Sequence, residues 1–126
     1  MNMKRPVETT KAPRPIGPYS QAVEAGGFLF VSGQLGINPA TGEMAQGVEA
    51  QARQALKNLI AVLEAAGSGV ENVAKVTVFV RNIGDFSTVN KVYQEFFTQD
   101  YPARAVVEVS GLPAGGLVEI ECIAAL

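Results

Sequence analysis

The chain has 126 residues, with 10 basic and 12 acidic side chains, one cysteine and no histidine. This composition excludes an internal disulfide, and it leaves neither a set of soft zinc ligands nor a Ser/His or Cys/His nucleophile pair. The formal net charge of -2, without a basic stripe or an apolar stretch of bilayer length, argues against nucleic-acid and membrane binding. We therefore expect one soluble, cytoplasmic domain over residues 1–126.

The first elements in chain order are an arm and a hairpin. Basic residues at positions 4–14 lie among prolines without an apolar segment, which indicates an arm or edge strand rather than a secretory signal. The pair Gly26-Gly27 within residues 22–32 predicts a hairpin that leads into a buried strand. Residues 38–42, Asn-Pro-Ala-Thr-Gly, predict a turn.

Two helices are expected in the middle of the chain. Apolar residues recur at helical spacing over residues 48–66, and Gly67 follows where a C-terminal cap is expected. The β-branched run 73–80 predicts a strand, and Asp85 is the expected N-cap of a second helix that Pro102 ends. The apolar stripe of this second helix consists of Phe86, Val89, Tyr93, Phe96 and Phe97.

Two strands near the C-terminus carry isolated charges. Alternation places Arg104, Val106 and Glu108 on one face of the run 101–109, and Glu119, Glu121 and Ile123 on one face of the run 118–123. An arginine near a carboxylate on so hydrophobic a sheet predicts a pocket for a small carboxylate-bearing molecule, and a structural ion pair is the alternative. Cys122 shares the apolar phase, so we expect it to pack in the core.

The order strand, strand, helix, strand, helix, strand, strand predicts an α+β, two-layer domain with two helices on one face of the sheet. Two helices cannot bury both faces. The residues that we expect on the uncovered face are Phe28, Phe30, Val73, Thr77, Phe79, Val106 and Ile123. An apolar patch of this size predicts self-association, with Arg104 and Glu119 in a cleft between subunits.

Several segments together resemble the reactive-intermediate deaminase family (Rid, also called YjgF). They are Ile-Gly-Pro-Tyr-Ser-Gln-Ala at 16–22, Val-Ser-Gly-Gln at 31–34, Asn-Pro-Ala-Thr-Gly-Glu at 38–43, Gln-Ala-Arg-Gln-Ala-Leu at 51–56, Pro-Ala-Arg at 102–104 and Val-Glu-Ile-Glu at 118–121. Each motif alone is weak, and their joint order from residue 16 to the C-terminus carries the resemblance.

The resemblance implies a chorismate-mutase-like fold with a mixed β-sheet, assembled as a homotrimer with its sheets inside and three sites between subunits. The last strand would then lie between the first core strand and the middle one, so residues 110–116 would not form a tight hairpin. The implied activity is hydrolysis of small 2-imino acids, such as 2-iminopropanoate and 2-iminobutanoate, to 2-oxo acids and ammonia, with no metal or organic cofactor.

The resemblance also implies the site residues. Arg104 would hold the substrate carboxylate, Glu119 would orient or activate water, and Tyr19 would line the pocket. The backbone of Gly33 would approach the ligand, because a missing side chain permits that approach. The remaining lining residues would be Ser32, Asn90 and Val106, the last at a position where many deaminating members have cysteine.

Other interpretations stay open. Tyr19 could pack a turn, Ser32 and Gly33 could be a strand end, and Asn90 could be an exposed helix residue. Glu121 would be a structural partner for a basic residue, and Glu108 would be a solvated or paired charge. Lys75 would belong either to the pocket or to a salt bridge at its rim. The alternative function is a non-catalytic trimer, a sensor or chaperone that binds 2-oxo acids. A mutase for dicarboxylates rests on fold analogy alone, and the lack of clustered basic residues disfavours ribonuclease activity.

Overall fold

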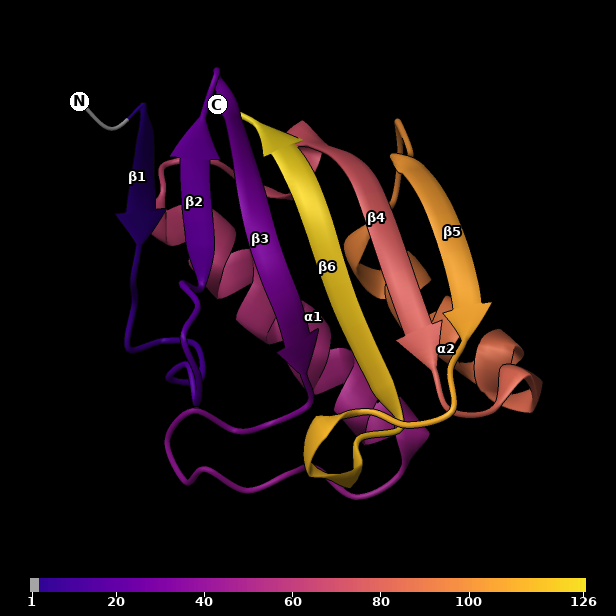
Figure 1. The fold of residues 1–126 in the computed structure, drawn as a ribbon. Helices are drawn as coiled ribbons and strands as arrows, with labels where there is room; N and C mark the ends of the chain where they lie inside the picture. Colours follow the sequence, from indigo (N-terminus) through magenta and orange to yellow (C-terminus); the bar gives the residue numbers. More distant parts are fainter. Residues whose placement is uncertain (1–2) are drawn as a thin grey trace.

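A computed structural model, which describes residues 3–126, shows two layers (Figure 1). The strands are β1 (Lys4–Val7), β2 (Ala22–Ala25), β3 (Phe28–Leu35), β4 (Val73–Val80), β5 (Ala103–Glu108) and β6 (Val118–Ala125), and the helices are α1 (Val48–Ala65) and α2 (Phe86–Phe96). The strands form one sheet in the order β1-β2-β3-β6-β4-β5, and both helices cover the same face. The β4–β5 pair is parallel and the other pairs are antiparallel, so the predicted mixed sheet is confirmed.

The last strand lies inside the sheet, between β3 and β4. The chain leaves the edge strand β5 and passes beneath the ends of β4 and β6 before β6 begins (Figure 1). The expectation that residues 110–116 are not a tight hairpin is therefore confirmed. Because β6 pairs with a strand on each side, the backbone around Glu119 is held by two ladders.

Helix α1 forms as its pattern predicts. Its apolar stripe, which includes Ala55, Leu56 and Leu59, is fully buried against the sheet. The helix ends at the predicted place: Gly67 adopts a φ of 79°, and the Ser68 N–H donates to the Leu63 carbonyl at 2.9 Å. This is the glycine-terminated cap that satisfies carbonyls of the last turn.

Helix α2 begins after Asp85, but the predicted cap is wrong in detail. The Asp85 side chain makes no capping hydrogen bond. Instead, the Asn82 side chain accepts a hydrogen bond from the Gly84 N–H at 2.8 Å and caps the short 3-10 turn Ile83–Asp85 that leads into the helix. Asp85 thus marks the start of α2 as predicted, but the residue that caps the helical segment is Asn82, three positions earlier.

The two faces of the sheet differ in exposure. Leu29 and Ile120 face the helices and are fully buried, whereas Phe28 and Phe30 on the opposite face are 46% and 45% exposed. The predicted uncovered apolar face therefore exists. We call it the open face, and its apolar members include Phe28, Phe30, Phe79, Ala105, Val107 and Ile123.

Two residues expected on the open face lie on the helix side instead. A register irregularity between Val73 and Lys75 turns Val73 into the core, where it is 6% exposed. Val106 pairs in register with the buried Val78 and packs against the core. The predicted alternation along β5 is confirmed, but the face assigned to Val106 is wrong. Arg104, which shares the phase of Val106, therefore also projects toward the helices. No helix within residues 3–126 has the length and apolarity needed to cross a bilayer.

Candidate functional site

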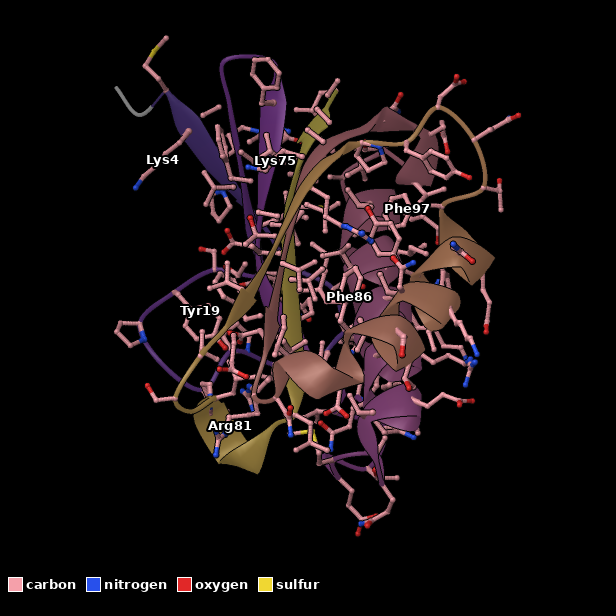
Figure 2. All side chains as sticks on the ribbon, turned by 90° about the vertical axis from the view of Figure 1, so that its right-hand side faces the viewer. Lys4, Tyr19, Lys75, Arg81, Phe86 and Phe97 are labelled. Carbon is pink, nitrogen blue, oxygen red and sulfur yellow. The ribbon has the colours of Figure 1, made fainter. Side chains whose placement is uncertain are left out.

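Four of the predicted site residues gather on the open side of the sheet. Tyr19, Ser32, Gly33 and Glu119 all line a hollow of about 550 Å³, and we call this group the carboxylate half. Figure 2 shows Tyr19 on the side of the sheet away from the helices. The other lining residues are Pro13, Arg14, Ile16, Gln21, Gln34, Leu35, Ile37, Pro113 and Glu121. Residues from the arm, β3 and β6 thus meet at one end of the sheet.

The absence of a side chain at Gly33 makes room for the Glu119 carboxylate. A Cβ atom at Gly33 would lie 2.7 Å from Cδ of Glu119 and 2.9 Å from its Oε2, closer than real Cβ contacts allow. The β3–β6 ladder is irregular between Val31 and Gln34, so β3 is distorted at this point. The close approach that Gly33 permits in this structure is to the Glu119 side chain, and the predicted approach of its backbone to a ligand stays a prediction.

Glu119 sits in an unusual electrostatic position for a surface carboxylate. Partial burial raises the pKa of Glu119 above its ordinary value, and the negative charge of Glu121 raises it further. Within residues 3–126, the ion pairs shorter than 4.0 Å are Arg5–Glu24, Arg53–Glu49 and Arg53–Glu95. Glu119 therefore has no cationic partner in its own described chain, and its oxygens are free to accept hydrogen bonds from water or ligand.

Ser32 and Gln21 fix the segment that carries Tyr19. The Ser32 hydroxyl donates to the Ser20 carbonyl at 2.6 Å, and its backbone N–H donates to the Gln21 carbonyl at 2.9 Å. The buried Gln21 amide donates to the carbonyls of Thr9 and Pro13 and accepts from the Thr9 N–H. Sequence reasoning missed Gln21, because a lone glutamine before a strand carries no pattern that marks it as buried.

The other predicted residues form a second group at the edge strand β5. The Nη1 atom of Arg104 donates to Oδ1 of Asn90 at 2.8 Å, and Val106 lies two residues further along β5 on the same side. We call Asn90, Arg104 and Val106 the arginine half. The Arg104 guanidinium carbon lies 4.7 Å from the ring centroid of Tyr93 and 5.6 Å from that of Phe86.

Arg104 is held by neutral groups only. None of the ion pairs within residues 3–126 includes it, so the alternative of an internal structural ion pair is wrong for the described chain. An amide and two aromatic rings orient a guanidinium without cancelling its charge. The guanidinium therefore keeps its capacity to bind an anion.

The two halves lie on opposite faces of the sheet. Arg104 pairs with Val76, whose side chain faces the helices, whereas Glu119 pairs with Phe79, whose side chain faces the open side. In Figure 2, Phe86 of the arginine side lies between the sheet and α2, while Tyr19 lies beyond the opposite face. The expectation that Arg104 lies near a carboxylate is thus not met within one chain. Within one chain, the residues of the carboxylate half lie together and the residues of the arginine half lie together, but the two halves are apart.

The remaining charged candidates have different surroundings. The exposed Glu108 carboxylate accepts a hydrogen bond from the Ile83 N–H at 2.8 Å and takes part in none of the ion pairs of residues 3–126. Glu121 lines the hollow and is exposed, and the basic partner expected for it is not among the ion pairs of residues 3–126. Lys75 projects from the open face opposite Ile123. It likewise takes part in none of those ion pairs.

Cys122 packs in the core as predicted. Burial, with a smaller contribution from Glu121, raises the pKa of the Cys122 thiol to about 12. The thiol therefore stays protonated at neutral pH and is a poor nucleophile. Within residues 3–126, no group of three or more cysteine, aspartate or glutamate side chains is arranged to hold a metal ion.

A second hollow, of about 810 Å³, adjoins the first along the N-terminal arm. Arg14, Tyr19 and Gln21 line both hollows, and the rest of the second one comes from residues 8–15 and Pro39. None of the other predicted site residues lines it. Its polar walls extend the carboxylate half toward solvent.

Comparisons with known proteins cover nearly the whole chain. The family model described as "Endoribonuclease L-PSP" matches residues 9–126. A RutC family protein from Pyrococcus horikoshii is 52% identical over 123 residues, which is 97% of this chain and 98% of that one. A 2-iminobutanoate/2-iminopropanoate deaminase from Bos taurus is 50% identical over 123 residues, 97% of this chain and 90% of that one. The crystal structure of RidA from a Psychrobacter species superposes with a TM-score of 0.95 at 43% identity, covering 97% of this chain and 99% of that one.

Proposed function

Because the chain belongs to the reactive-intermediate deaminase family, whose family model is described as endoribonuclease L-PSP, we propose that it hydrolyses small 2-imino acids to 2-oxo acids and ammonia. The proposed substrates are 2-iminopropanoate and 2-iminobutanoate, after the activity for which the bovine relative is named. The family relation alone leaves the activity open, since other relatives are described only as RutC family proteins. The geometry of the two halves supports the choice.

The single observation that carries the proposal is the unpaired Arg104 guanidinium. Its neighbours are the Asn90 amide and the rings of Tyr93 and Phe86, all neutral. A planar guanidinium with free N–H groups binds a carboxylate through two parallel charge-assisted hydrogen bonds. A small 2-imino acid presents such a carboxylate next to its reactive carbon.

The arginine half and the carboxylate half complete one site when they come from neighbouring copies of the chain. The open face exposes aromatic and aliphatic side chains that a monomer would leave in water, and a homotrimer with its sheets inside would cover them. Glu119 projects from that face, whereas Arg104 lies on the edge strand β5 and projects toward the helix side, so one chain alone does not bring them together. We place one site at each subunit boundary, with Arg104 from one protomer and Glu119 from the next.

The chemistry needs few groups, because a protonated imine is already a strong electrophile. Arg104 holds the substrate carboxylate, and Glu119 accepts a proton from a water molecule as that water adds to the imine carbon. Glu119 passes that proton to the carbinolamine nitrogen. The C–N bond then breaks as Glu119 takes the hydroxyl proton and the C=O bond forms, ammonia leaves, and Glu119 releases the proton to solvent. A carboxylate base in this position contributes about 100- to 10,000-fold. Its raised pKa makes Glu119 a stronger base than an ordinary glutamate while it remains ionised.

The other predicted residues shape the pocket. Gly33 keeps the space beside the Glu119 carboxylate open, and Tyr19 forms a wall of the same hollow. Asn90 orients Arg104, and the partly buried Val106 gives the arginine half an apolar floor where many relatives are expected to have cysteine. Ser32 supports the Tyr19 segment through its bond to Ser20 and keeps its oxygen as an acceptor.

The first experiment measures imine hydrolysis directly. An amino-acid oxidase acting on alanine generates 2-iminopropanoate, which reacts with semicarbazide faster than pyruvate does, so that a hydrolase lowers the initial rate of semicarbazone formation. We expect the wild-type chain to lower that rate and Arg104→Ala or Glu119→Gln to lose at least about 100-fold of kcat/KM. Arg5→Ala, in the edge strand β1 and paired with Glu24, is the matched control and should keep full activity.

The second experiment tests whether the site is shared. The inactive variants Arg104→Ala and Glu119→Gln are unfolded together, refolded as a mixture and assayed. If each site takes Arg104 from one protomer and Glu119 from its neighbour, about a quarter of the sites in a random mixed trimer are intact. If both residues acted within one chain, every chain would lack one of them and the mixture would stay inactive.

Two alternatives are separated by the same material. A non-catalytic sensor or chaperone would bind pyruvate or 2-oxobutanoate through Arg104 without changing the initial rate of semicarbazone formation. The endoribonuclease description of the family model predicts RNA cleavage. We expect none, because the net charge of -2 and the scattered basic residues offer no phosphate-binding surface. Cleavage of RNA that depends on Arg104 or Glu119 would overturn the deaminase proposal.

A further inference from the structure

Helix α2 presents an aromatic surface under the proposed substrate-binding arginine. The residues on this surface, Phe86, Asn90 and Tyr93, are spaced by four and three positions and therefore share one side of the helix. The sequence pattern assigned Phe86 and Tyr93 to the apolar stripe that packs the core. The structure shows that both rings also lie within cation–π distance of the Arg104 guanidinium.

We infer that Tyr93 is a positioning residue for Arg104: its ring is a rigid, neutral seat that orders the guanidinium before the substrate carboxylate arrives. The identity of the ligand in this inference rests on the proposed function, whereas the contact between Tyr93 and Arg104 does not depend on it. Of the two rings, Tyr93 lies closer, at 4.7 Å against 5.6 Å for Phe86. Tyr93 is 5% exposed and Phe86 is 37% exposed, so Tyr93 is the fixed member of the pair.

The Tyr93 ring is itself held in place. It stacks on Phe97 with a centroid separation of 4.5 Å and an interplanar angle of 24°, and Phe97 is only 3% exposed. Figure 2 shows Phe97 on the helix side of the sheet, as is Phe86. A stacked and buried pair cannot change rotamer without opening the core. The seat is therefore as rigid as the helix–sheet packing beneath it.

The aromatic ring of Tyr93, and not its hydroxyl, positions the Arg104 guanidinium. The Tyr93 hydroxyl is buried and has no hydrogen-bond partner within residues 3–126. Burial also raises the pKa of Tyr93, so the ring stays neutral and offers its face rather than a negative charge. A carboxylate in the same place would bind Arg104 more strongly but would compete with the substrate. An aromatic seat orders the arginine and leaves its charge available.

Three variants isolate the ring. Tyr93→Leu keeps apolar volume and removes the ring face, Tyr93→Phe keeps the ring and removes the unpaired hydroxyl, and Val92→Ala destabilises the same helix at a fully buried position of the core. A clamp that acts on ground and transition states alike changes KM. We expect Tyr93→Leu to raise KM for 2-iminopropanoate about 3- to 30-fold with kcat nearly unchanged.

The conservative variant should rescue the effect. Tyr93→Phe should show wild-type KM and equal or higher thermal stability, because it removes a buried hydroxyl without a partner. Val92→Ala should lower thermal stability and leave KM unchanged. An unchanged KM in Tyr93→Leu, or a KM in Val92→Ala raised as much as in Tyr93→Leu, would overturn the inference.

A double-mutant cycle with 2-oxobutanoate separates this inference from the proposed function. If Tyr93 acts through Arg104, Tyr93→Leu weakens 2-oxobutanoate binding in the wild-type background and has no further effect in Arg104→Ala. A wild-type chain that binds 2-oxobutanoate but hydrolyses no imine would refute the deaminase and still test the seat. Equal effects of Tyr93→Leu in both backgrounds would refute the seat.

A ligand-free measurement decides the case in which nothing binds. The Nε–H resonance of Arg104, assigned by its loss in Arg104→Lys, should be shifted by the ring current of Tyr93. That shift should persist in Tyr93→Phe and shrink in Tyr93→Leu to the smaller contribution of the more distant Phe86 ring. A shift that is absent in the wild type, or unchanged in Tyr93→Leu, would contradict an ordered guanidinium over the Tyr93 ring.

Discussion

Apolar side chains are buried on the helix-covered face of the sheet and exposed on its open face. Leu29 points toward α1 and is completely buried, while the next residue, Phe30, points the other way and is 45% exposed. The buried hydrophobic cluster lies between the covered face and the helices, and Phe28 and Phe30 are outside it. Exposed aromatic residues on one face of a sheet indicate an interaction surface, and Glu119 projects from this same face.

The largest expected effect separates folding from assembly at two neighbouring residues. Leu29→Asp places an unpaired carboxylate in the core and should cost more than about 4 kcal/mol, enough to unfold a domain of ordinary stability. Phe30→Asp places the same charge on the open face, and should leave a folded monomer without deaminase activity. Circular dichroism and sedimentation measure the two outcomes. A trimeric, active Phe30→Asp would show that the open face is not the interface.

A smaller change at Gly33 should damage the site and spare the fold. In Gly33→Ala the new Cβ would meet the Glu119 carboxylate at 2.7 Å, so that carboxylate must move. Misplacement of a catalytic group by about 1 Å costs roughly 100-fold in rate. We expect a loss of about 10- to 100-fold in kcat with a nearly unchanged melting temperature. Gly111→Ala, where a Cβ would meet nothing within 4 Å, is the matched control.

The pH dependence of stability gives a third, weaker contrast. Burial raises the pKa of Glu119 in the folded state, so the unfolded chain binds fewer protons between the ordinary and the raised value. Stability attributable to Glu119 is therefore present at low pH and is lost as pH rises through the folded pKa. We expect Glu119→Gln to melt at a higher temperature than the wild type at pH 7.5, and the difference to disappear at acid pH. A variant less stable than the wild type at pH 7.5 would contradict this sign.

The smallest effect is expected for an arginine that does have partners. Arg53 of α1 donates to the Glu95 carboxylate of α2 at 2.7 Å, on the exposed side of the helix layer. Exposed ion pairs contribute little, because water and salt screen them. Glu95→Gln should change the melting temperature by less than about 2 °C and leave catalysis intact. Since Arg104 takes part in none of the ion pairs of residues 3–126, Arg104→Ala should show the reverse, with large kinetic and small thermal effects.

The sequence determined the elements that depend on local pattern. The periodicity of residues 48–66 and Gly67 defined α1 and its end, and alternation defined which residues of β5 and β6 share a face. It also placed Cys122 in the core. These features follow from the geometry of helices and strands, in which a residue's neighbours along the chain fix its phase. The joint order of the motifs, together with these elements, identified the family and with it the fold.

Only the tertiary structure decided which face of the sheet each alternating set of side chains occupies. Arg104 turns toward α2 because β5 pairs in parallel with β4 and matches Arg104 to the inward-facing Val76, and Val73 turns inward because of an irregular register beside it. A shift of one residue reverses every side chain of a strand, and no local pattern reports which layer covers which face. For that reason the sequence identified Arg104 and Glu119 as charges on largely apolar strands, and only the folded chain showed that they project from opposite faces.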